Sequence, residues 1–110
     1  MVYSKKEREQ YNNYRIAVCE RLGIRELDYN AFRRLGQSLH YYYEANCNGD
    51  FNEEEGQYEV FVKPLYAKAD SLAKRLNLYI YYQTDPRGGT IYLDKKPIPE
   101  NNYTIANLVY

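Results

Sequence analysis

The fold is decided by residues 78–94, which read LYIYYQTDPRGGTIYLD. From Leu78 onward the apolar side chains follow a period of two, which is typical of a β-strand. Asp85-Pro86-Arg87-Gly88-Gly89 then offers a proline that presets φ for a turn and glycines that accept positive φ. Strand character resumes over residues 90–94. The stretch therefore predicts an antiparallel β-hairpin in which Gly88 is left-handed.

The same alternation assigns the two faces of the hairpin. One face carries Leu78, Ile80 and Tyr82, and the other carries Tyr79, Tyr81 and Gln83. If helices cover the first face, Tyr79 and Tyr81 form an exposed row on the second. Beyond the hairpin, residues 95–102 hold two prolines and predict a loop, and residues 103–109 predict a third strand.

Three helices are predicted before the hairpin. A capping box from Ser4 to Glu7 predicts a helix over residues 5–22 that ends at Gly23. Asp28 is the expected N-cap of a second helix, with Asn48-Gly49 at its end. A third helix either starts near Pro64 or follows a short offset turn, and Asn77 closes it. Its apolar face is predicted from residues that recur at three and four positions, namely Phe61, Leu65, Ala69, Leu72 and Leu76, with Tyr58 and Val62 one turn earlier.

These elements predict a single α+β domain over residues 1–110, with three helices packed on one face of a three-stranded antiparallel sheet. The chain has 110 residues, no apolar run long enough for a membrane span, and a polar start without a signal core. We therefore expect a cytoplasmic protein with no membrane attachment. With 15 basic and 15 acidic residues, its overall charge excludes a generic nucleic-acid binder.

The acidic residues are unevenly distributed. Residues 37–62 contain no Lys or Arg and six carboxylates, which are Glu44, Asp50, Glu53, Glu54, Glu55 and Glu59. Such a run is either a solvated connection between helices or a patch that docks on a basic surface. In the second interpretation Glu53, Glu54 and Glu55 contact the partner.

Tyrosine is the outlier of the composition, with 15 residues against three Phe and no Trp. A tyrosine suits half-buried positions and contact surfaces, because its ring is apolar and its hydroxyl is polar. Tyr41, Tyr42 and Tyr43 wrap around one helix, so they cannot all face the core. Tyr42 continues the inward face, and Tyr41 is the expected outward ring. Tyr41, Tyr79 and Tyr81 are either a contact surface for a protein or stacked bases, or ordinary coverage of a small domain.

Catalytic and metal-binding patterns have no support in the sequence. His40 is the only histidine, and Cys19 and Cys47 lack the close spacing of a zinc site. Cys47 lies two helical turns from His40, about 10 Å along the axis, which is too far for activation of its thiol. Gly88-Gly89 does not open a helix as a phosphate loop does. We therefore predict no enzyme, no cofactor and no metal, and whether Cys19 pairs with Cys47 stays open.

Several segments resemble small, mostly uncharacterised proteins of bacteriophages and plasmids. The similarity lies in residues 82–93 with their Asp-Pro-Arg-Gly turn, in residues 105–110, and in the helical residues 34–40 and 44–49. The tyrosine enrichment and the acidic connection depart from that pattern. The resemblance implies a protein that binds a host factor, as the inhibitors of CRISPR-Cas nucleases do.

Two functions are expected from these observations. The first is a non-enzymatic counter-defence protein that binds and inhibits a CRISPR-Cas effector, with Glu53–Glu55 facing a basic nucleic-acid channel and Tyr41, Tyr79 and Tyr81 as anchors. The second is a small nucleotide or nucleic-acid binding module in which Tyr79 and Tyr81 stack and Arg87 holds a phosphate. Arg87 either projects from the hairpin tip toward a phosphate or carboxylate of a partner or forms a salt bridge with the acidic run of the same chain.

Overall fold

A computed structural model describes residues 4–47, 58–85, 88–100 and 105–110 of the chain. In chain order the elements are α1 (Lys5–Leu22), α2 (Glu26–Cys47), the π-helical turn η1 (Tyr58–Val62), α3 (Lys63–Arg75), β1 (Tyr79–Asp85), β2 (Gly88–Asp94) and β3 (Asn107–Leu108). The three strands form one antiparallel sheet in the order β1-β2-β3. The predicted α+β class is confirmed.

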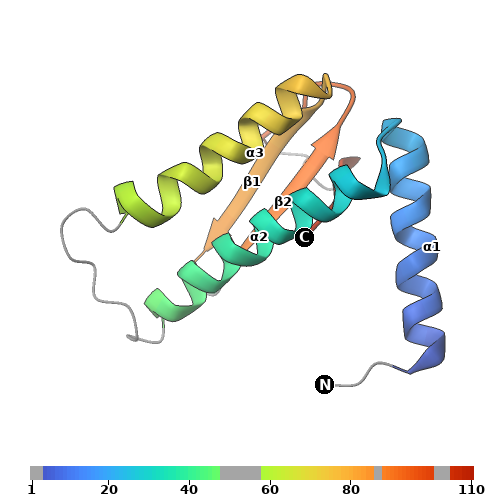
Figure 1. The fold of residues 1–110 in the computed structure, drawn as a ribbon, viewed down its shortest axis with the longest axis horizontal. Coiled ribbons are helices and arrows are strands. Elements are labelled where there is room, and N and C mark those ends of the chain that lie inside the picture. Colours follow the sequence, from blue (N-terminus) through green and yellow to red (C-terminus); the bar gives the residue numbers. More distant parts are fainter. Residues whose placement is uncertain (1–3, 48–57, 86–87, 101–104) are drawn as a thin grey trace.

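The helices are not equivalent in their relation to the sheet. Figure 1 shows α2 and α3 lying side by side across β1 and β2, with α1 standing at a steep angle beside α2. The hydroxyl of Tyr14 on α1 donates to the carbonyl of Leu108 on β3 at 2.8 Å, which ties α1 to the sheet edge. One buried cluster joins these layers, and it includes Val18, Phe32, Leu39, Val62, Ile91 and Leu93.

The first helix begins and ends as predicted. The Ser4 hydroxyl accepts from the Glu7 amide at 3.2 Å, and the Glu7 carboxylate accepts from the Ser4 amide at 3.0 Å. Gly23 closes the helix with a left-handed φ of 67°.

The start of α2 differs from the prediction, because Asp28 is not its N-cap. The helix begins at Glu26, and Asp28 lies in the first turn. Its carboxylate reaches back to accept from the backbone amide of Arg25 at 3.4 Å, so it satisfies an otherwise unpaired donor from inside the helix.

The third helix follows an offset turn, as one of the two alternatives predicted. Pro64 lies in the first turn of α3, where no intrahelical amide donor is needed, and Asn77 after the helix has a φ of 58°. The predicted apolar phase was wrong at Phe61, which is 57% exposed while Val62 is fully buried. Val62 lies seven residues, or two α-helical turns, before the buried Ala69, so it continues the inward face, whereas Phe61 lies one position off that face.

The hairpin is confirmed, and Gly88 has a second role besides the positive φ that was predicted. Asp85 pairs with Gly88, and the connecting residues 86 and 87 lie outside the described part. The φ of Gly88 is +158°, which L side chains rarely adopt, although it is far from the left-handed helical value near +60°. A Cβ atom on Gly88 would also collide with the imidazole of His40 on α2. Glycine is therefore required both by its backbone conformation and by the close approach of the strand to the helix.

The third strand is shorter than the predicted 103–109. It consists of Asn107 and Leu108, and residues 101–104 are not described. After Leu108 the Ile91 carbonyl accepts from two successive amides, those of Val109 at 2.9 Å and Tyr110 at 3.4 Å. Two residues opposite one is the pattern of a β-bulge, and it interrupts the regular ladder.

Candidate functional site

The face of the sheet turned away from α2 and α3 carries a group of aromatic and apolar side chains. The register aligns Tyr81 with Tyr92 and Tyr92 with Leu108, while Tyr79 lies opposite Asp94. We call Tyr79, Tyr81, Tyr92 and Leu108 the open face. Tyr79 is 50% exposed and Leu108 is 39% exposed. The predicted row of Tyr79 and Tyr81 therefore lies on the side opposite α2 and α3, but of the two only Tyr79 is exposed, because Tyr81 is half-buried.

Two rings of the open face contact each other. The Tyr81 and Tyr92 centroids are 6.3 Å apart with a tilt of 53°, and the Tyr92 hydroxyl donates to the side-chain carbonyl of Gln83 at 3.4 Å. A base cannot stack in parallel between rings that are tilted and in contact. The open face therefore presents ring edges and one exposed phenol, which suits an irregular protein surface.

A second group of tyrosines lies between the helices and the sheet, and we call Tyr42, Tyr43, Tyr66 and Tyr82 the covered group. The Tyr43 and Tyr66 hydroxyls are 2.9 Å apart, and the Tyr66 and Tyr82 rings meet edge to face at 4.7 Å. The Tyr82 hydroxyl donates to the Asp70 carboxylate at 2.7 Å. Burial, and then the bonded Asp70, raise the pKa of the Tyr82 phenol. These contacts join α2, α3 and β1, which is a structural role.

The outward tyrosine of α2 does not join the open face. Tyr41 is 70% exposed, and Tyr42 beside it is only 9% exposed, so the predicted helical phase is confirmed. Tyr41 neighbours His40, which contacts Gly88 and Gly89 at the turn end of the hairpin. Tyr79 lies at the other end of β1, about 20 Å away along a seven-residue strand and on the other side of the sheet. The predicted tyrosine candidates thus form two separate surfaces.

The remaining predicted contact residues, Glu53, Glu54, Glu55 and Arg87, lie outside the described residues. The ends of the acidic run are described. Glu44 on α2 lies 3.5 Å from the Nε2 atom of His40, and Glu59 on η1 lies 3.0 Å from the Nζ atom of Lys63. Both pairs are local i,i+4 contacts, and the Lys63–Glu59 ion pair contributes a few tenths of a kcal/mol (about 0.3–0.5 for an exposed pair).

Two described side chains with the chemistry of a nucleophile or base, His40 and Cys19, have structural surroundings, whereas the side chain of Cys47 lies outside the described part. The Nδ1 atom of His40 accepts from the Gly89 amide at 3.3 Å, and its ring meets Tyr110 edge to face. Cys19 is a free, buried thiol, and desolvation followed by the charge of Glu26 raises its pKa. A raised pKa keeps a thiol protonated, which is the reverse of what a nucleophilic cysteine needs. Within residues 4–47, 58–85, 88–100 and 105–110, no three metal-binding side chains gather.

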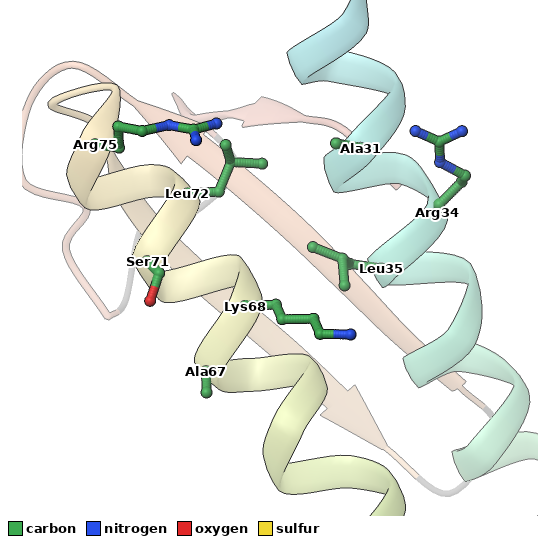
Figure 2. A pocket seen from close by; sticks show the side chains of 8 residues that line it. All are labelled: Ala31, Arg34, Leu35, Ala67, Lys68, Ser71, Leu72 and Arg75. Carbon is green, nitrogen blue, oxygen red and sulfur yellow. The ribbon is translucent and has the colours of Figure 1, made fainter.

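A groove between α2 and α3 was not predicted. It has a volume of about 660 Å³ and is lined by Ala31, Arg34, Leu35, Ala67, Lys68, Ser71, Leu72 and Arg75. Figure 2 shows Leu35 and Leu72 pointing toward each other, with Lys68 and Arg75 extending from α3 toward α2. One signal could have found it, since α3 holds four basic residues and one acidic residue. The packing of α3 against α2 depends on the whole fold, so the spacing of residues in the sequence could not predict it.

Comparison with known proteins adds no relative. No family model, curated protein or solved structure matches the chain. In the ranges that the structure describes, no helix combines the length and apolar character that crossing a membrane requires.

Proposed function

We propose that this chain is a non-enzymatic binding protein whose contact surface for a partner protein is the open face. The observation that carries the proposal is the exposure of Tyr79 and Leu108 beside the ring pair of Tyr81 and Tyr92. Exposed tyrosines are frequent anchors of protein interfaces, because a large ring is buried at little cost in side-chain entropy. The structural engagement of His40 and the raised pKa of Cys19 support binding in place of catalysis.

We propose further that the partner is a host defence protein in the bacterial cytoplasm, and that a CRISPR-Cas effector is the first candidate. The resemblance of residues 82–93 to bacteriophage and plasmid proteins supports this partner class. The run Glu53–Glu55 supports it as well, since nucleic-acid channels are lined with Lys and Arg that attract carboxylates.

The test is binding of the full chain to purified, guide-loaded CRISPR-Cas effectors by biolayer interferometry, with target DNA cleavage as the second readout. We expect Tyr79→Ala to weaken binding about tenfold or more with folding intact. Leu27→Ala on α2, where the side chain is 65% exposed, is the matched control and should leave affinity unchanged. Tyr41→Ala reports whether the separate surface on α2 contributes.

Two results would overturn parts of the proposal. Saturable binding of oligonucleotides or cyclic nucleotides at low salt, with no effector bound, would favour the nucleic-acid module that uses Tyr79, Tyr81 and Arg87. Charge reversal at Glu53, Glu54 and Glu55 should slow association and reduce its salt dependence, so unchanged kinetics would remove the acidic run from the interface.

A further inference from the structure

The groove between α2 and α3 combines an apolar floor with a basic rim. Leu35 and Leu72 are half-buried and face each other across it, and the small side chains of Ala31 and Ala67 leave room above them. The rim carries three exposed cations, which are Arg34, Lys68 and Arg75.

The acidic residues near this groove are engaged elsewhere. Asp70 on α3 accepts from Tyr82 of the sheet, Glu26 pairs with Arg15 of α1, and Asp28 pairs with Arg25. Among the residues that the structure describes, Arg34, Lys68 and Arg75 form no ion pair with a carboxylate. In a chain with zero net charge, the groove is therefore a local cationic surface.

We propose that this groove binds an acidic amphipathic helix of another protein. Leucine-sized side chains of such a helix would pack on Leu35 and Leu72, and its flanking carboxylates would meet Lys68, Arg75 and Arg34. The small residues at positions 31, 67 and 71 allow a second backbone to approach closely. A phosphate backbone fits less well, because the leucine floor offers it no hydrogen-bond donors.

This site is independent of the proposed open face. The groove lies between α2 and α3, on the side of the sheet that these two helices cover, and the open face is on the other side of the sheet. The chain would thus have two binding surfaces on opposite sides.

The experiment titrates the full chain against a fluorescein-labelled peptide of about 18 residues, or five helical turns. The peptide has leucine at helical spacing on one face and glutamate on the rest. Fluorescence anisotropy should show saturable binding that weakens with salt. The double variant Lys68→Glu, Arg75→Glu should lose about tenfold or more in affinity. Lys74→Glu reverses one charge on α3 outside the groove lining, so it should change affinity by about twofold or less.

A second variant tests the apolar floor without changing charge. Ala67 is exposed, so Ala67→Phe fills the groove without removing a side chain from the core. This variant should lower the affinity of the chain for the peptide. Tyr79→Ala should leave peptide binding unchanged, which separates failure of this proposal from failure of the open face. The proposal is wrong if the peptide does not saturate, if Lys74→Glu costs as much as the double variant, or if a peptide with lysine in place of glutamate binds equally well. Displacement of the peptide by an oligothymidylate would also overturn it.

Discussion

Tyrosine has two different roles in this protein. In the covered group it packs helices against the sheet, and on the open face it faces solvent, although Tyr81 of one group and Tyr82 of the other are neighbours in the chain. In the covered group, the hydroxyls of Tyr43, Tyr66 and Tyr82 find partners between the helices and the sheet. On the open face, Tyr79 turns half of its surface to solvent. The parity of a position in β1 decides between the two uses, so tyrosine content alone does not predict a binding surface.

The largest expected effect tests whether the covered group holds the fold together. Tyr42→Ala should lower the free energy of unfolding by about 3 kcal/mol or more, because it removes a buried ring and leaves a cavity. The control is Tyr41→Ala, one residue away and mostly exposed, which should cost about 1 kcal/mol or less. Urea denaturation of both variants makes the measurement. Equal losses would mean that the two faces of α2 do not differ as described.

The next largest effect tests the close packing of β2 against α2 at Gly88 and His40. Gly88→Ala should cost about 2 kcal/mol, because the new Cβ collides with the His40 ring and pushes the hairpin from α2. The double variant Gly88→Ala, His40→Ala should be less unstable than the sum of the single variants, which a double-mutant cycle of unfolding free energies measures. Strict additivity would remove the contact as the cause.

A smaller effect concerns the hydrogen bond inside the covered group. Tyr82→Phe removes the bond to Asp70 and should cost about 1 kcal/mol near neutral pH.

The raised pKa of the Tyr82 phenol leads us to expect that the protein loses stability at high pH. This pKa is raised above the ordinary value of 10.0, so at high pH the unfolded chain loses this proton before the folded chain does. Stability should therefore be complete below pH 10 and fall as the pH rises above it. Tyr82→Phe should make this fall shallower in urea titrations at several alkaline pH values. An unchanged slope would show that Tyr82 does not drive it.

The smallest effect is expected on the open face. Tyr79→Ala should change the free energy of unfolding by about 0.5 kcal/mol or less, because the ring is half exposed. Thermal unfolding measures the change. A loss as large as that of Tyr42→Ala would mean that Tyr79 is part of the core, and the comparison of the two groups would fail.

Local patterns predicted much of this fold, because the forces behind them act within a few residues. The capping box of Ser4 and Glu7, the left-handed Gly23 and the alternation from Leu78 to Gln83 are set by neighbouring backbone groups. Residues distant in sequence decide the rest. Gly88 meets His40, and Leu35 meets the groove partner Leu72 only once α2 and α3 lie together on the sheet.

Two predictions from local sequence patterns were wrong, the N-cap at Asp28 and the inward position at Phe61. Asp28 is a good N-cap residue, but its carboxylate serves α2 equally well from the first turn. The repeat through Phe61, Leu65 and Ala69 used successive steps of four residues, which drift off the 3.6-residue period, so Val62 and not Phe61 lies in phase with Ala69. Of the candidate site, the parity of Tyr79 and Tyr81 was predictable, and the groove was not.

The contact between His40 and Gly89 also has a consequence for the speed of folding. It closes a loop of 49 residues, whereas the hairpin joins residues that are close in the chain. We therefore expect the hairpin to form before β2 docks on α2, and this docking to limit the folding rate, because loop entropy is lost before the contact forms. We expect substitutions at His40 and Gly88 to slow folding, whereas substitutions in α1 accelerate unfolding.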